Sequence, residues 1–182
     1  SGLFGVQDVA EFDSIAAQAP EGSGGLIFLP YIEGERSPIF DPNARGVYFR
    51  IASEHGKAHF MRATLEGVTL ALRSILEVYR ETRQISDIRV IGGGGRSRLW
   101  RQMMADIFNV PTWTVSSRTS SVTSRGVALA AAVGVGVYKD LGQAGAAFSP
   151  VEWSEPRPEF SKLYDDLYKT FVELYCRIND LY

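Results

Sequence analysis

The stretch "IRVIGGGGRSRLWRQMMADIF", residues 88–108, joins an apolar segment to an amphipathic one through four consecutive glycines. It predicts a strand at Ile88–Ile91, a bare turn and a helix at about Ser97–Asn109. Glycine lets a ligand approach the main chain closely, and the free amides that open a helix favour anions. The stretch therefore indicates a phosphate-binding turn. The alternative is that the glycines only make a tight connection between strand and helix.

Two common nucleotide motifs do not fit this turn. A P-loop requires Gly-Lys-Ser/Thr, but here Gly95 is followed by Arg96 and Ser97. A dinucleotide fingerprint starting at Gly92 would have a serine in place of its third glycine, and it also needs an acid about 20 residues later. No Asp or Glu occurs between Asp106 and Asp140. What remains is a phosphate-binding turn without its own catalytic lysine or magnesium ligand.

The surrounding pattern predicts alternating α/β organisation. Apolar residues at steps of three and four mark a long helix at Lys57–Thr82, and a stripe of the same kind marks a final helix from about Phe160. The helix at Val127–Tyr138 is apolar all round, so we expect it to lie between a sheet and another element. The remaining expected elements are a helix at Asp8–Ala19 and strands at Leu26–Tyr31 and Trp113–Val115.

Composition indicates a globular chain of 182 residues, with 45% apolar residues, 22% charged residues and a net charge of −2. Its longest apolar run, Gly126–Tyr138, is shorter than the roughly 18 residues that cross a bilayer, and the start does not resemble a signal peptide. We therefore expect a cytoplasmic protein without membrane partners. The single cysteine, Cys176, excludes an internal disulfide. Residues 84–139 carry seven basic and two acidic residues, a field suited to phosphates but too sparse to predict nucleic-acid binding.

Four motifs occur in order along the chain: "LPYIEGERSPIFDPNARGVYF", "HFMRATLEGV", "IGGGGRSRLWRQMMADIFNVP" and "GVALAAAVGVGVY". Together they resemble the C-terminal half of the FGGY carbohydrate kinases, most closely the xylulokinase and gluconokinase branch. The resemblance implies an α/β, actin-like ATPase fold of the ribonuclease H-like type, as one half of a two-domain sugar kinase. It also implies transfer of the γ-phosphoryl group of ATP, bound with Mg²⁺, to the hydroxyl of a sugar such as xylulose, gluconate or another pentulose.

By the family pattern, the glycines would lie along the nucleotide phosphates, and the two residues that follow Arg96 would flank the adenosine. The implied cofactor-binding residues are Gly93, Gly94, Gly95, Ser97 and Arg98. The family's general base is an aspartate of the first domain, so the resemblance implies no catalytic residue in this segment. Sugar contacts would likewise come from that domain.

The expected division of the chain is a lead-in segment at 1–25, an α/β core at 26–150 and a C-terminal tail and helix at 151–182. The whole would be a nucleotide-binding domain that is inactive without its sugar-binding partner domain. A non-catalytic actin-like module that binds a nucleotide or a partner is the alternative. A homodimer is left open.

Several other residues carry a functional and a structural interpretation. Glu35 and Arg36 could position a substrate, or they could form an ion pair that shapes their loop. Glu66 could be catalytic, but it is expected to pair with Arg62, four residues earlier on the same helix, or to bond to a nearby loop.

Two histidines and two tryptophans also carry both a functional and a structural interpretation. His55 and His59 have the spacing of metal ligands on one helix face, but no third ligand accompanies them, so we predict no metal site. Trp100 and Trp113 could stack on adenine, although their apolar surroundings favour core packing.

Overall fold

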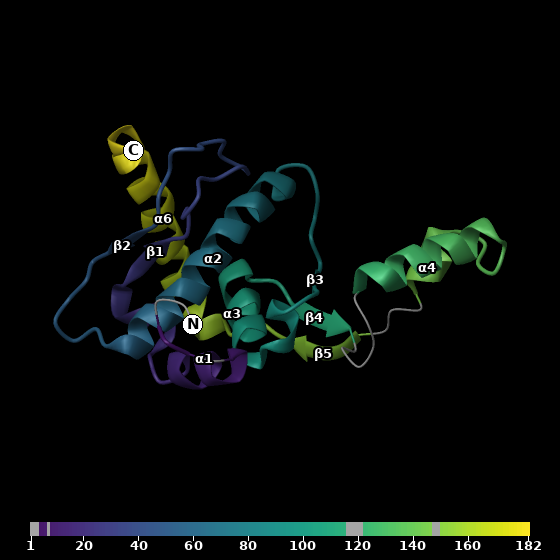
Figure 1. The fold of residues 1–182 in the computed structure, drawn as a ribbon, viewed down its shortest axis with the longest axis horizontal. Helices are drawn as coiled ribbons and strands as arrows, with labels where there is room; N and C mark the ends of the chain where they lie inside the picture. Colours follow the sequence, from purple (N-terminus) through teal and green to yellow (C-terminus); the bar gives the residue numbers. More distant parts are fainter. Residues whose placement is uncertain (1–3, 7, 116–121, 147–149) are drawn as a thin grey trace.

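A computed structural model describes residues 4–6, 8–115, 122–146 and 150–182 (Figure 1). Helices and strands alternate through the middle of the chain, as predicted. The α-helices are α1 (Val9–Ala16), α2 (Lys57–Arg80), α3 (Arg98–Phe108), α4 (Val122–Gly134), α5 (Leu141–Gly145) and α6 (Ser161–Ile178). The strands are β1 (Ile27–Leu29), β2 (Val47–Phe49), β3 (Ile88–Val90), β4 (Thr112–Val115) and β5 (Pro150–Ser154). Short 3₁₀ turns are η1 (Glu21–Gly25), η2 (Gly94–Arg96), η3 (Pro158–Phe160) and η4 (Asn179–Leu181).

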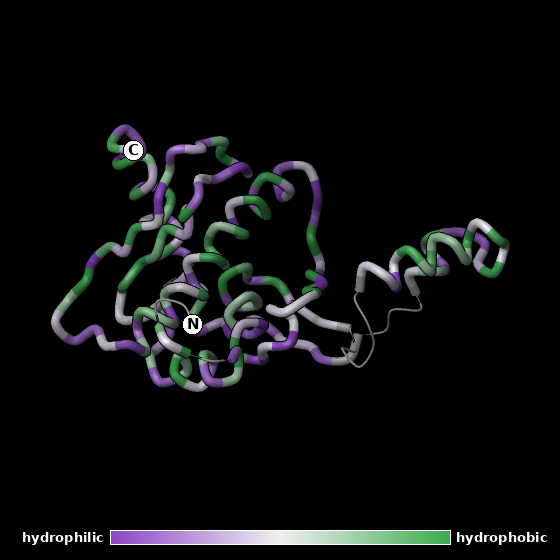
Figure 2. The backbone as a smooth tube through the Cα atoms, in the orientation of Figure 1, coloured by the Kyte–Doolittle hydropathy of each residue, from purple (hydrophilic) through white to green (hydrophobic). Residues whose placement is uncertain are grey.

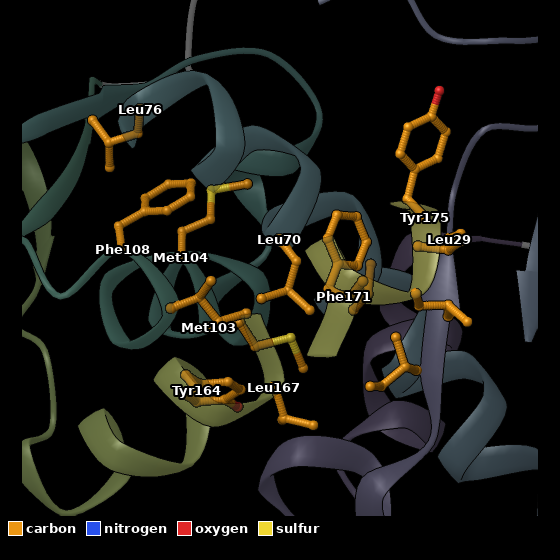
Figure 3. Packing of buried hydrophobic residues seen from close by; sticks show 14 of the residues in the cluster. Leu29, Leu70, Leu76, Met103, Met104, Phe108, Tyr164, Leu167, Phe171 and Tyr175 are labelled. Atoms are coloured by element: carbon orange, nitrogen blue, oxygen red, sulfur yellow. The ribbon is translucent and has the colours of Figure 1, made fainter. Parts of the chain in front are cut away.

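The long helix α2 organises the body of the molecule, because α1, β1, α3 and α6 all pack against it. Its apolar stripe begins at Met61 and Leu65, which are both buried. The core continues onto α3 and α6, where Met103, Phe171 and Tyr164 are almost fully inaccessible. Figure 3 shows these side chains meeting between the helices and β1. The helix therefore docks on both a strand and other helices, consistent with its predicted amphipathic character.

Two small sheets accompany the helices. Strands β1 and β2 pair antiparallel, whereas β3 and β4 pair parallel. A parallel pair needs a crossover, and α3 supplies it between β3 and β4. The third strand of the second sheet is β5, which pairs antiparallel with β4. The sequence pattern missed β2 and β5, and the expected division between 26–150 and 151–182 falls within β5.

A buried polar cluster connects η1 and α6 to α2. The carboxylate of Glu66 accepts bonds from the Gly22 amide at 2.9 Å, the Ser23 hydroxyl at 2.7 Å and the Tyr164 hydroxyl at 2.9 Å. It also pairs with Arg62, with an Nε–Oε1 distance of 3.0 Å, which confirms the predicted pair. Burial, followed by the adjacent carboxylate charge, raises the pKa of the Tyr164 phenol, so it remains a neutral donor.

The expected burial of the small-residue helix is wrong. The helix spans Val122–Gly134, and α5 is the element against which it packs within the described residues. It projects away from the body in Figure 1, and Figure 2 shows its largely hydrophobic colouring. Val127 is 67% exposed, and Val135 and Val137, which follow the helix, are 79% and 68% exposed. An apolar sequence favours burial, but it does not identify the covering surface, and among the described residues the short helix α5 covers only part of α4.

Candidate functional site

The glycine turn lies between β3 and α3, as the sequence predicted. Gly92 has a φ of 82°, a value that favours glycine over other residues. Residues Gly94–Arg96 then form the 3₁₀ turn η2, closed by a bond of 3.1 Å from the Arg96 amide to the Gly93 carbonyl. Ser97 follows with extended backbone and begins α3. The segment therefore folds as strand, glycine turn and capped helix.

The three candidate phosphate-binding glycines have different surroundings. A Cβ added to Gly95 would lie 2.9 Å from the Val90 carbonyl oxygen, and one added to Gly94 would lie 2.9 Å from the Trp100 ring. Both positions thus need glycine for packing alone. A Cβ at Gly93 would meet nothing within 4 Å, and this residue already has helical backbone angles. Gly93 is the open position at which a ligand can approach and at which a side chain can be added without steric cost.

The two residues expected beside adenosine are placed differently. Ser97 is 3% exposed, and its hydroxyl accepts a bond of 2.9 Å from the Trp100 amide. Its structural role is therefore that of the N-cap of α3. Arg98 is exposed on the first turn of the same helix. A guanidinium in this position can reach a bound anion without first being desolvated, whereas the serine hydroxyl already has a partner.

A buried arginine that the sequence patterns did not identify supports the turn. Arg101 is 2% exposed, and its Nη1 donates to the Gly95 carbonyl at 2.5 Å. Its Nη2 donates to the Glu152 carboxylate on β5. The amphipathic pattern that predicted this helix assigned no role to Arg101. No pattern in the sequence pairs it with a residue fifty-one positions later.

An apolar groove of about 640 Å³ opens beside the turn, between α2 and β3. Gly94 and Trp100 contribute to its lining. Along α2, Leu72 and Tyr79 belong to the predicted buried stripe, yet they are 41% and 56% exposed at this groove. On the opposite wall Ile91 is 53% exposed. The groove is a poor site for phosphate itself, because apolar side chains dominate its lining.

The two tryptophans are packing residues. Trp113 is 6% exposed, and its indole donates to the Asp87 carboxylate at 2.7 Å, which confirms its predicted place in the core. This bond, followed by that from Ser86, holds the pKa of Asp87 below its ordinary value. Trp100 is half-buried and donates to the Thr69 hydroxyl at 2.9 Å. Both rings are already engaged by the protein.

The Glu35–Arg36 pair does not take the expected form of a side-chain ion pair. The Glu35 carboxylate instead accepts from the backbone amides of Arg36, at 2.6 Å, and Ser37, at 3.2 Å. The Glu35 backbone also exchanges two bonds with Asp41 across the loop. Glu35 therefore shapes its loop through the main chain, and the Arg36 side chain is exposed.

The histidines have local roles. His55 Nδ1 accepts from the Ala52 amide at 3.1 Å, and His59 Nδ1 accepts from the Gly56 amide at the start of α2, at 3.2 Å. Their ring centroids lie 5.2 Å apart. Across the described ranges, no group of three His, Cys, Asp or Glu side chains converges as a metal site. Within the same ranges, no helix is both long and apolar enough to span a membrane.

The sequence and the fold both match known proteins. Residues 5–135 match the FGGY family of carbohydrate kinases, C-terminal domain. The xylulose kinase of Staphylococcus epidermidis is 36% identical over 181 residues, covering 98% of this chain and 36% of that protein. The structure of a ligand-bound xylulose kinase from Lactobacillus acidophilus superposes with a TM-score of 0.85 at 31% identity. The superposition covers 95% of this chain and 35% of the Lactobacillus acidophilus chain.

A gluconate kinase from Lactobacillus acidophilus is equally similar in structure. Its TM-score is 0.85 at 30% identity, over 97% of this chain and 36% of that one. The chain therefore belongs to the FGGY family of carbohydrate kinases and has the α/β fold of their C-terminal domain. It spans about a third of the length of the relatives it matches.

Proposed function

We propose that this chain is the nucleotide-binding wall of an ATP-dependent sugar kinase, with xylulose as the first candidate substrate. The support is a similarity to xylulose kinases that covers nearly the whole chain. Gluconate or another pentulose is the alternative substrate, since a gluconate kinase matches the fold equally well. ATP would supply the γ-phosphoryl group, and the sugar hydroxyl would accept it.

The observation that carries the proposal is the open backbone at Gly93, within a strand, turn and capped helix that the family match includes. Phosphate groups need close approach to backbone donors, and the absent Cβ leaves that approach clear. Gly93 would contact the phosphates, and the exposed Arg98 would lie at the nucleotide. Gly94, Gly95 and Ser97 would act mainly by giving the turn its shape.

The chain would position the nucleotide rather than perform the whole reaction. Phosphoryl transfer depends on holding both reactants and stabilising charge across the cleft. The general base and most sugar contacts would come from the two-thirds of the family's chain that the match does not cover. Magnesium would enter bound to ATP, and the 182-residue segment alone would not turn over.

The exposed apolar surfaces are consistent with a chain that forms one part of a larger kinase. The groove beside Gly94 and the helix α4 both present side chains that favour burial. In the complete kinase, other segments of the protein would cover them. A non-catalytic module that binds nucleotide and a protein partner, including a second copy of itself, is the competing function favoured by the same exposed surfaces.

The test is an assay of xylulose and gluconate phosphorylation by a kinase polypeptide that includes this domain. Gly93→Asp adds a negative charge where a Cβ has room, so the KM for ATP should rise by about tenfold or more over that of Gly93→Asn, its neutral isostere. The KM for sugar should not change. Nucleotide binding without phosphorylation of any sugar would favour the non-catalytic module.

A further inference from the structure

Arg101 makes two contacts that link the glycine turn to the C-terminal segment. From α3, one end of its guanidinium donates to the Gly95 carbonyl, and the other donates to Glu152 on β5. The planar guanidinium holds its donors in a fixed relation, so it sets the position of one partner relative to the other. The turn is thus connected through one side chain to a strand that lies more than fifty residues later.

The contact with Gly95 controls more than one atom of the turn. The Gly95 carbonyl and the Arg96 amide belong to the same rigid peptide plane. That amide donates to the Gly93 carbonyl at 3.1 Å and closes the turn. A guanidinium on the carbonyl side also polarises the plane and strengthens the bond on the amide side. Arg101 therefore fixes the backbone up to Gly93, the open position of the candidate site.

The burial of Arg101 indicates that these contacts are the reason for its presence. Its Nε is buried without a hydrogen-bond partner among the described residues. An unsatisfied donor of this kind is unfavourable, and apolar residues often replace buried ion pairs without loss of stability. Its partner Glu152 is 56% exposed at the side chain, so water could solvate that carboxylate alone. If the side chain at this position contributed only to stability, an apolar residue would serve as well as arginine.

We propose that Arg101 is a positioning residue for nucleotide binding, acting through the Gly95 carbonyl and anchored by Glu152. The C-terminal strand β5 thereby sets the geometry of the phosphate-binding turn. The inference rests on the proposed nucleotide function. The effect of Arg101 on the backbone of the turn, however, can be measured without nucleotide.

The test uses Arg101→Met, with Arg73→Met as a matched control. Arg73 is also a buried arginine, 9% exposed, and it pairs with Asp165 on α6 far along the chain from the turn. In the 182-residue chain, hydrogen exchange of the Arg96 amide, which closes the turn, should accelerate by about tenfold in Arg101→Met and remain unchanged in Arg73→Met. In the kinase polypeptide, Arg101→Met should raise the KM for ATP by about tenfold or more, with the KM for sugar unchanged.

Two further variants keep the test decisive if Arg101→Met folds poorly. Arg101→Lys retains the charge without the fork and should give intermediate effects, and Glu152→Gln removes only the anchoring charge and should give the smallest. Wild-type exchange at the turn in all three variants would overturn the proposal. Faster exchange in a protein whose wild type binds no nucleotide would instead overturn the nucleotide function and leave the structural link standing.

Discussion

Helices α6 and α4 are both rich in apolar residues, yet only α6 is buried. On α6 the apolar residues form one stripe, and Tyr164 and Phe171 are 0% and 1% exposed. On α4 they surround the helix, and Val127 is 67% exposed. A single apolar stripe specifies which face of the helix must pack. The opposite polar face can remain in solvent, so one covering surface is enough. A helix that is apolar all round requires several covering surfaces, and its own sequence identifies none of them.

The contrast between the two helices distinguishes the body of the molecule, whose apolar side chains are buried within the chain, from surfaces whose apolar side chains remain exposed. The stripe of α6 meets β1, α2 and α3 within the described residues. The exposed α4 and the groove between α2 and β3 are two regions where apolar side chains remain accessible. We expect mutations in the body to affect stability and mutations in α4 to affect assembly.

The largest effect is expected from Phe171→Ala on α6. This ring lies in the core seen in Figure 3, so its removal should lower the free energy of unfolding by about 3–5 kcal/mol. Denaturant titration followed by circular dichroism would measure the loss. The matched change on α4, Val127→Ala, should alter stability by less than about 0.5 kcal/mol. Similar losses in both variants would contradict the distinction between the two helices.

A smaller effect is expected from Tyr164→Phe, which removes one donor to the buried Glu66 carboxylate. Because the remaining donors to Glu66 are unaffected, the loss should be about 1.5–3 kcal/mol at neutral pH. Denaturant titration at pH 7 would measure it. An unchanged free energy of unfolding would show that the cluster is satisfied without this hydroxyl.

The same variant has a distinct pH signature. The pKa of Tyr164 is raised in the folded protein, so its neutral form contributes stability that is present below the unfolded value of about 10 and is lost above it. The free energy of unfolding should therefore decline less steeply above pH 10 in Tyr164→Phe than in the wild type. Burial also raises the pKa of Tyr31, so part of the alkaline decline should persist.

Periodicity predicted most of the body. Apolar steps of three and four located α2 and α6, and the helix expected at about Ser97–Asn109 is α3, for which the structure shows these two residues to be the caps. Short strands were harder, because three residues such as Val47–Phe49 carry too little alternation to be distinguished from a loop. Strand β5 was missed for a related reason: its proline-rich surroundings indicate a turn, and only its pairing with β4 reveals the strand.

The sequence predicted the place of the glycine turn between β3 and α3, but not the surroundings of its individual residues. Four glycines after a strand mark a close approach of backbone and ligand, whereas the sequence cannot show that Trp100 and Val90 already require two of them. Likewise, the contact between Arg101 and Glu152 depends on how β5 returns to the sheet. Such long-range contacts follow from the tertiary arrangement, and local patterns do not contain them.

The most direct test of the nucleotide-binding role is an NMR titration of the 182-residue chain with the magnesium complex of ADP. The amide resonances of Gly93, Gly94 and Gly95 should shift together and saturably, while those of α6 should remain in place. The shifts should be lost in Gly93→Asp and weakened to a smaller extent in Gly93→Asn, which adds a side chain of the same shape without the negative charge. Saturable shifts that leave all three glycines unmoved would contradict the assignment of this turn as the nucleotide site.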